Sequence, residues 1–355
     1  MLVDCDVHEM LKSERDLLPY LKGAEFVSAI RDRDWHMEVR FPFGKAQPTV
    51  GGLDRADAKP ADGGPGGSDL ELMRRQVLDE EGAAYAVLTG LFYPSVMNAW
   101  PDFACALASA YNDWVVDNWL EQDDRLLGSV HVAAQRPAEA AREIDRMGAH
   151  PQIKQVMLPL CQHLYGDPHF HEIFAAAERQ GLVIAMHNCG ATLTTHGYFN
   201  YFIEWHTAIC QSWMSQIISM ISNGVFERFP TLKAVMAESG FTWVPHLMSR
   251  FDQQWRELRR EVPWVTRAPS DYIRERIRFT TQPVEEMPVE RVLQLIDWME
   301  SDELLVYSSD YPHWDYDAPQ EAVRGLPEGL QRKILFDNAA ALYAIKAPEP
   351  QLSPA

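Results

Sequence analysis

The sequence of 355 residues predicts an α/β fold, a (β/α)₈ barrel with an insertion after its first strand. Short apolar runs rich in β-branched residues alternate with longer amphipathic runs, and eight such units are the number that closes a barrel of parallel strands. Such a barrel takes roughly 250 residues before insertions, which leaves room for an extra loop but little for a second domain. The competing open, doubly wound sheet would need a glycine-rich turn after its first strand, and the segment DCDVHEM contains no glycine.

The expected elements follow from periodicity and from residues that begin or end helices. Several amphipathic runs open with Asp or Pro, as first helical turns do, and two of them close on glycine. Strands are expected over 2–8, 83–89, 126–132, 153–159, 182–187, 232–238, 277–282 and 304–310. Helices between them are expected over 69–82, 101–120, 167–181 and 288–300.

The domain boundaries are set by two irregular stretches. Residues from about 12 to 68 lack clean periodicity and include KPADGGPGGS, in which glycine and proline disfavour both helix and strand. We interpret them as an insertion within one domain that spans 1–345. The proline-rich segment 346–355 is expected to be a flexible tail.

Composition limits the partners and the location of the protein. The chain is 46% hydrophobic and 23% charged, as expected for a globular protein, and its net charge of −19 argues against nucleic acid as a partner. No apolar run is long enough to span a bilayer, and the first residues resemble a strand rather than a signal segment. The five cysteines form no CxxC pair, which is typical of reduced thiols. We expect a cytoplasmic protein. The 11 Trp, 12 Tyr and 15 Phe predict extensive buried surface, part of which is expected to form a homo-oligomer, a dimer.

Residues that can bind a metal stand at the ends of several expected strands. His8, His187, Glu238 and Asp310 each terminate an apolar run. In a (β/α)₈ barrel the carboxyl ends of the strands converge on the face where active sites are built. Four segments that are distant in the sequence are therefore expected to bring two imidazoles and two carboxylates to one rim.

The first strand is expected to supply two of the ligands. Alternation places Asp4, Asp6 and His8 on one face and Cys5 and Val7 on the other, with Asp6 and His8 about 7 Å apart along the strand. Each signal has another explanation when it is taken alone. The Asp-x-His pair also fits a capped turn, and His187 also fits a buried histidine without a metal. Asp310 also fits the cap of a following helix. The placement of all these residues at the strand ends of one barrel instead favours a site for one divalent ion. We expect it to be held by Asp6, His8, His187 and Asp310.

The segments DCDVH, FPTLKAVMAESGFTWVPHLMSRFD and SSDYPHWD, together with His187, resemble the amidohydrolase superfamily. The likeness is to the amidohydrolase-related branch, which includes aminocarboxymuconate-semialdehyde decarboxylase and resorcylate decarboxylase, and it covers residues 1 to about 345 outside the insertion. The resemblance implies a barrel with one divalent ion, commonly zinc or manganese, and iron is the other ion that we consider. By position, its ligands map onto Asp6, His8, His187 and Asp310. Many members have His-x-His or Glu-x-His on the first strand, and Asp-x-His here keeps a hard oxygen donor.

A second departure from the family pattern bears on the reaction. The resemblance to the decarboxylases implies a catalytic histidine at the end of the sixth strand, where this chain has Glu238. This difference favours a hydrolase that acts on a small cyclic or carboxylated molecule through a metal-activated water. We expect Asp310 to shuttle protons as well as bind the ion, and Glu238 to act as a second base. His313 is expected to orient the substrate or to support the metal ligands. A salt bridge between Glu238 and a nearby Arg or Lys remains an alternative.

Three other functions stay open. A non-oxidative decarboxylase of an aromatic or enoic acid would use the same ion. His206, Arg250 and Trp314 are candidates for binding its substrate, and the aromatic segment from 187 to 206 suits a planar molecule. His196 and His206 could hold a second ion, as in a dinuclear oxygenase. An inactive barrel that serves as a subunit is the remaining alternative, and the four retained ligands argue against it.

Overall fold

A computed structural model describes residues 1–32, 53–91, 100–160, 163–188 and 201–346. His196, residues 33–52 of the expected insertion and the tail from 347 onward lie outside these ranges. In the described part, eight parallel strands form one sheet in sequence order, and each overlaps an expected strand. They are β1 (Val3–Val7), β2 (Tyr85–Leu88), β3 (Leu126–His131), β4 (Ile153–Leu160), β5 (Val183–Asn188), β6 (Ala234–Met236), β7 (Ile277–Thr280) and β8 (Leu305–Val306).

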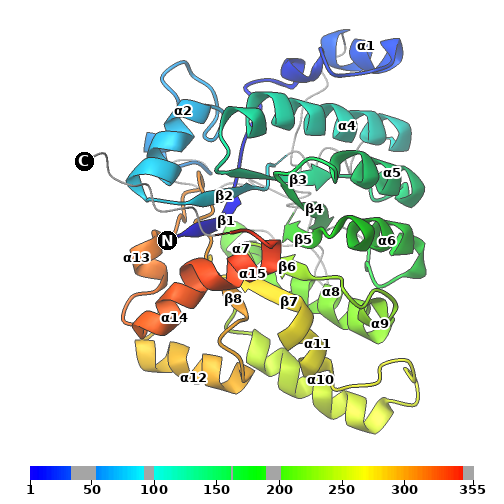
Figure 1. The fold of residues 1–355 in the computed structure, drawn as a ribbon, viewed down its shortest axis with the longest axis vertical. Helices are drawn as coiled ribbons and strands as arrows, with labels where there is room; N and C mark the ends of the chain where they lie inside the picture. Colours follow the sequence, from blue (N-terminus) through cyan, green and yellow to red (C-terminus); the bar gives the residue numbers. More distant parts are fainter. Residues whose placement is uncertain (33–52, 92–99, 161–162, 189–200, 347–355) are drawn as a thin grey trace.

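The first and last strands of this sheet come together through backbone hydrogen bonds. The backbone N–H of Cys5 donates to the carbonyl of Tyr307 at 3.0 Å, and that of His8 donates to the carbonyl of Tyr311 at 2.8 Å. The sheet therefore closes on itself, with helices packed around its outside (Figure 1). The predicted (β/α)₈ barrel is confirmed.

Helices connect the strands, and several begin with proline at a first-turn position, where its missing N–H costs nothing. The longer helices are α1 (Ala24–Asp32), α4 (Pro101–Asn118), α5 (Pro137–Met147), α6 (His171–Gln180), α7 (Phe202–Ala208), α8 (Cys210–Ser222), α10 (Val244–Leu258), α11 (Pro269–Arg276) and α12 (Val289–Met299). The shorter ones are α2 (Leu70–Met73), α9 (Val225–Arg228), α13 (Pro319–Ala322), α14 (Glu328–Arg332) and α15 (Asn338–Tyr343). Single turns or π-helical segments are η1 (Glu14–Leu17), η2 (Ala56–Ala58), η3 (Arg74–Glu80), η4 (Leu120–Gln122), η5 (Pro168–Phe170) and η6 (Lys333–Asp337). None of the helices in the described ranges has the length and apolar character that crossing a membrane requires.

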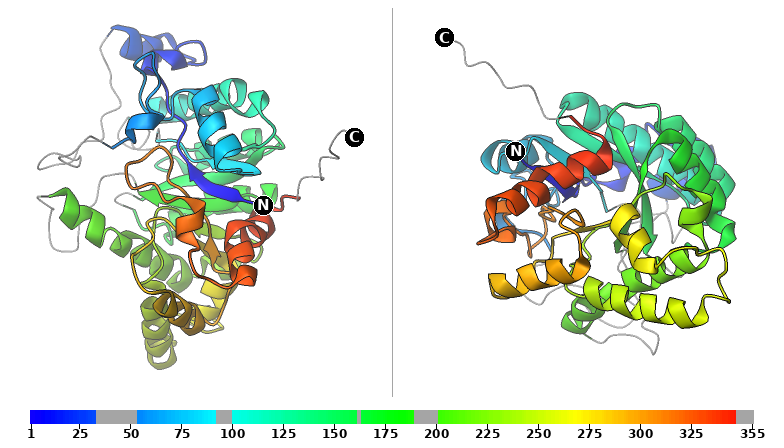
Figure 2. Two further views of the ribbon diagram at one scale, coloured as in Figure 1. Left: turned by 90° about the vertical axis from the view of Figure 1, so that its left-hand side faces the viewer. Right: turned by 60° about the horizontal axis from the view of Figure 1, so that its bottom comes forward.

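The segments η6 and α15 close one end of the barrel. Phe336, Leu342 and Tyr343, from η6 and α15, pack in one apolar cluster with inward-facing strand residues such as Val3 and Val183. The start of β1 lies beside α15, and the two views in Figure 2 agree on this placement. Since this end is filled by apolar side chains, the opposite end, where the strands terminate, is the end available for a polar site.

A β-bulge in β1 corrects one of the predictions. Asp4 pairs with Ala86, but Val7 pairs with Leu88, so β1 contains one residue more than β2 over this interval. Consequently Cys5 packs in the inner cluster and Val7 in the outer one, although alternation placed them on the same face. The bulge lies between Asp4 and Val7, and the prediction that Cys5 and Val7 share a face was wrong.

Candidate metal centre

The four residues predicted to bind an ion lie together at the carboxyl ends of the strands. Asp6 and His8 come from the end of β1, His187 from β5, and Asp310 from the segment after β8. One ligand atom from each lies within 4.8 Å of those of the other three, and all four residues are buried. The convergence expected from the sequence is present in the structure.

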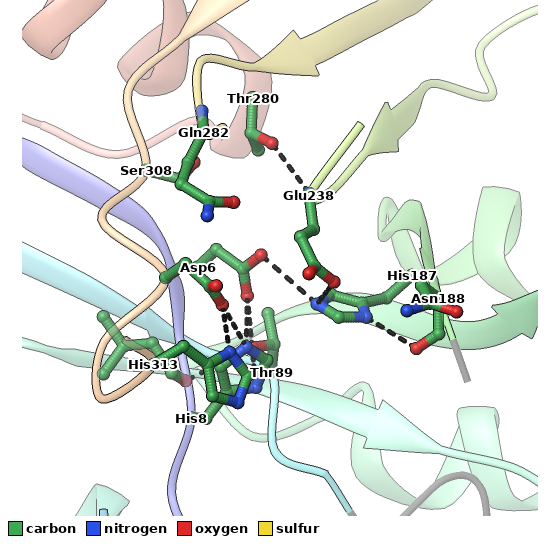
Figure 3. A network of polar contacts seen from close by, with 12 residues as sticks. Asp6, His8, Thr89, His187, Asn188, Glu238, Thr280, Gln282, Ser308 and His313 are labelled. Atoms are coloured by element: carbon green, nitrogen blue, oxygen red, sulfur yellow. Dashed lines mark hydrogen bonds and ion pairs between the residues drawn. The ribbon is translucent and has the colours of Figure 1, made fainter. Parts of the chain in front are cut away.

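The contacts within this group alternate imidazole nitrogens with carboxylate oxygens. His8 Nε2 lies 2.8 Å from Asp310 Oδ1 and 3.5 Å from Asp6 Oδ1. On the other side, His187 Nε2 lies 3.4 Å from Asp6 Oδ2 (Figure 3). Asp6 therefore bridges the two histidines, with one oxygen directed at each.

Backbone carbonyls fix the orientation of both imidazoles. His8 Nδ1 lies 3.0 Å from the carbonyl oxygen of Gly90, and His187 Nδ1 lies 2.8 Å from that of Asn188. A carbonyl oxygen only accepts, so each Nδ1 carries the hydrogen, and Nε2 is the nitrogen that faces the centre of the group. Metal-binding histidines are usually held in this way.

The electrostatics of the group favour a cation. Burial is the largest influence and would lower the pKa of both histidines. The charge of Asp6 acts together with the Asp310 hydrogen bond at His8 and with the Asp6 hydrogen bond and Glu238 charge at His187, and the net result is a raised pKa for both. The Oδ2 atoms of Asp6 and Asp310 are buried, and neither accepts a hydrogen bond from the described residues. Because unsolvated carboxylate oxygens are costly unless they are paired or coordinate a metal, these residues fit one divalent ion. Two nitrogen and two oxygen donors suit zinc, manganese or iron.

Glu238 stands at the edge of this group, directly after β6. Its backbone has a φ of 54°, and its backbone N–H donates to Thr280 Oγ1 at 2.9 Å. Its Oε2 lies 3.4 Å from His187 Nε2, so among the described residues its ion-pair contact is with a histidine of the site rather than with an arginine or lysine. Burial raises the pKa of Glu238 well above its ordinary value, and the charge of Asp310 adds to this effect.

His313 contacts the group from the segment after β8. Its Nδ1 lies 2.7 Å from Asp310 Oδ1, and its ring lies 4.6 Å from the ring of His8. Burial opposes protonation of this histidine, but the Asp310 charge and hydrogen bond prevail and raise the pKa of His313 to about 9. Asp310 thus contacts His8 and His313 through a single oxygen.

The residues predicted to bind substrate are distributed over two places. His206, on α7, has its Nε2 3.2 Å from Asp315 Oδ2, and its ring lies 6.0 Å from that of Trp314. These three residues form one cluster beside the metal centre, since the charge of Asp315 also raises the pKa of Glu238 and of His313. Arg250 is exposed on α10, and the described contacts do not connect it with the ligand group.

Three polar residues of the site were missed from the sequence. Thr89 Oγ1 donates to Asp6 Oδ1 at 2.5 Å and so orients a ligand. His131 is buried at the end of β3, where burial first and the charges of His187 and His8 next lower its pKa to about 3. Gln282 is buried just after β7. Each of them lies at or near the end of an expected strand, so the rule that identified the ligands would have found them.

A model of the amidohydrolase family matches residues 3–345 of the chain. The chain belongs to the amidohydrolase family. The resemblance inferred from DCDVH, His187 and SSDYPHWD is thereby confirmed, and the protein is an enzyme of this superfamily.

Solved structures similar to this amidohydrolase include three decarboxylases. The 5-carboxyvanillate decarboxylase of Sphingomonas paucimobilis is 23% identical, with a TM-score of 0.67 over 97% of this chain and 99% of that one. The 2,6-dihydroxybenzoate decarboxylase from Rhizobium is 15% identical, with a TM-score of 0.69 over 97% and 98% of the two chains. The 5-carboxyvanillate decarboxylase of Novosphingobium aromaticivorans, solved with manganese and a nitrobenzoic acid, is 16% identical, with a TM-score of 0.68 over 97% and 96%. At these identities the likeness establishes a shared fold.

Proposed function

We propose that this amidohydrolase is a metal-dependent, non-oxidative decarboxylase of an aromatic or enoic acid, most directly a hydroxylated benzoate. The observation that carries the proposal is the buried group of Asp6, His8, His187 and Asp310, with Glu238 and His313 in contact with it. The proteins of similar structure are decarboxylases of carboxylated phenols. They favour decarboxylation over hydrolysis, the reaction that Glu238 led us to expect from the sequence.

The ligand group has the donor atoms that one divalent ion needs. When bound, such an ion would polarise oxygens of the substrate carboxylate and of a neighbouring hydroxyl. The chain contributes the placement of the donors. The Gly90 and Asn188 carbonyls turn the Nε2 atoms of His8 and His187 inward, and Thr89 orients the Asp6 carboxylate. A manganese or zinc ion is our expectation, since both accept mixed imidazole and carboxylate ligands.

Decarboxylation requires a proton donor within reach of the substrate. The bond between the ring carbon and the carboxylate carbon breaks, carbon dioxide leaves, and the electron pair on the ring carbon takes up a proton. Glu238 and the Asp310–His313 pair are the groups placed to hold that proton, because both lie against the ligand group. We assign the donor role to Glu238. It occupies the position after the sixth strand at which the family resemblance implied a histidine.

Aromatic side chains near the centre suit a planar substrate. The ring of Phe202 stacks on His206 at 5.3 Å, and Trp314 lies 6.5 Å from Phe202 with nearly half of its surface exposed. Flat apolar surfaces of this kind bind benzoate rings while the polar centre holds the carboxylate. A substrate-binding role for His206 and Trp314 is part of the proposal. The described contacts of Arg250 give no comparable support for a role in substrate binding.

Release of carbon dioxide tests the proposal directly. The metal-loaded enzyme is incubated with 2,6-dihydroxybenzoate, 5-carboxyvanillate and related hydroxybenzoates, with Mn²⁺ or Zn²⁺ present. We expect release from at least one acid, and its loss after chelation or in Asp310→Asn. If every acid is inert while lactones or amides are hydrolysed, the enzyme is a hydrolase. Oxygen consumption together with two bound ions would instead indicate a dinuclear oxygenase. A cytoplasmic location and a homodimer stay predictions.

A further inference from the structure

A buried glutamine lies at the same end of the barrel as the ligand group. Gln282 follows β7 and is 0% exposed. Its backbone N–H lies 3.3 Å from Ser308 Oγ, and its backbone carbonyl accepts from the N–H of Gly240 at 3.3 Å. These bonds hold Gln282 between the segments that follow β6 and β8. In Figure 3 its carboxamide points toward the space in which the carboxylates of Asp6 and Glu238 lie.

Asp315 determines which way the carboxamide of Gln282 is turned. The amide Nε2 lies 3.1 Å from Asp315 Oδ2 and 3.3 Å from the carbonyl oxygen of Asp315. Both partners are acceptors, so the flipped amide would place its own oxygen against them. The Asp315 carboxylate is held in turn by His206 Nε2 at 3.2 Å. The nitrogen of Gln282 therefore faces Asp315, and its oxygen faces away from Asp315.

The oxygen of this fixed amide lacks a donor. Gln282 Oε1 is buried and has no hydrogen-bond partner among the described residues. A buried acceptor in this state costs about 1–3 kcal/mol. The ionised carboxylates of Asp6 and Asp310 only accept hydrogen bonds, so they cannot supply the donor. The carboxyl group of Glu238 contacts His187 through Oε2 and makes no hydrogen bond to Gln282 Oε1. A hydroxyl group on a molecule bound at the centre would satisfy Oε1.

We propose that Gln282 Oε1 accepts a hydrogen bond from a hydroxyl of the substrate and thereby selects hydroxylated acids. The inference rests on the proposed function, since it names the kind of acid that the site takes. A methoxy group or a bare ring position offers no donor, so the oxygen stays unpaired when such an acid binds. Asp315 acts as a positioning residue, because it fixes the direction of the amide. His206 holds the Asp315 carboxylate in turn.

Ligand binding and turnover are measured separately to test this inference. Calorimetry compares 2,6-dihydroxybenzoate with 2,6-dimethoxybenzoate on metal-loaded enzyme, for the wild type, Gln282→Met and Asp315→Asn. Methionine has a similar volume and no amide oxygen, whereas Asp315→Asn removes the charge that fixes the amide. We expect the wild type to prefer the dihydroxy acid by about 10- to 100-fold in Kd, as one lost hydrogen bond implies. Gln282→Met should remove most of this preference at unchanged metal content, and Asp315→Asn should weaken it.

The outcomes separate this inference from the proposed function. If Gln282→Met folds, retains its metal and keeps the wild-type preference, the inference is wrong even when carbon dioxide is released. Should Gln282→Met fail to fold, an unchanged preference in Asp315→Asn contradicts the inference in the same way. If no acid is decarboxylated but the binding preference disappears in Gln282→Met, the inference stands and the proposed reaction fails. Failure of both acids to bind the wild type overturns the inference.

Discussion

Removing the metal is expected to destabilise the fold measurably. Without an ion, the carboxyl groups of Asp6, Asp310 and Glu238 lie within one small buried region, where the described partners that offset negative charge are imidazoles. A cation that binds this group in the folded state alone shifts the unfolding equilibrium toward the folded protein. Dialysis against a chelator should therefore lower the unfolding midpoint, and Mn²⁺ or Zn²⁺ should restore it.

The size of the shift follows from the length of the chain. At a free metal concentration one hundred times Kd, binding stabilises the folded state by about 2.7 kcal/mol. Unfolding entropy of about 2.1 cal/mol/K per residue amounts to ~0.75 kcal/mol/K for 355 residues, so the midpoint should rise by about 4 °C. Each further tenfold increase in metal should add about 1.4 kcal/mol, or roughly 2 °C.

The assay is thermal unfolding followed by circular dichroism over a series of free metal concentrations. Asp310→Asn is the matched control, because the amide keeps the shape of the side chain but removes the charge that faces His8 and His313. Its midpoint should respond to metal only at much higher concentrations. A wild-type midpoint that is independent of metal, or an equal response in Asp310→Asn, would refute the assignment of the ligand group.

Three further predictions follow from single contacts. Glu238→Gln should lower kcat for decarboxylation by about 10²–10⁴-fold at unchanged metal content, which stopped-flow and metal analysis would measure, and a wild-type rate would exclude Glu238 as the proton donor. Asp4 Oδ1 accepts hydrogen bonds from the backbone N–H groups of Ser309 (2.9 Å) and Asp6 (3.3 Å), and so supports the segments that carry the ligands Asp6 and Asp310. Asp4→Ala should therefore weaken metal binding about 10-fold, whereas Asp4→Asn should retain it, as measured by competition with a chelator. Burial raises the pKa of Asp317 from 3.8 to about 6, so its contribution to stability is full below pH 3.8 and is lost as the pH rises through 6. Asp317→Asn should therefore raise the unfolding midpoint relative to the wild type above pH 6 and not at pH 3.5; an equal difference at both pH values would contradict this reasoning.

The fold could be predicted because its signal is periodic. Each strand is an apolar run whose side chains are buried on both faces of a closed sheet, and such runs stand out between amphipathic segments. The strand ends were less accurate for a local reason. The runs 232–238 and 304–310 end in Glu238 and Asp310, whose φ angles of 54° and 60° exclude these two residues from a strand. A left-handed residue turns the backbone out of the extended conformation, which an apolar pattern does not reveal.

The ligand residues could be predicted because they stand at strand ends. The faces of the residues in β1 could not, because they depend on the register between β1 and β2. Asp6, His8, His187 and Asp310 were found because parallel strands end at one rim. The bulge in β1 was not predictable, because an extra residue leaves the composition of the run unchanged while it moves Cys5 and Val7 to different faces.

Glu238 favoured hydrolysis in the sequence, but its position in the structure is compatible with decarboxylation. Glu238 replaces the histidine that the family resemblance implied, and the sequence suggested that a different residue type meant a different reaction. In the structure its carboxyl oxygen lies 3.4 Å from His187 Nε2 in buried surroundings. A carboxyl group there can hold and deliver a proton, as an imidazole can. The choice between the two reactions must then lie in what the neighbouring residues bind. The fixed amide of Gln282 and the aromatic surface of Phe202 and Trp314 suit a hydroxylated ring.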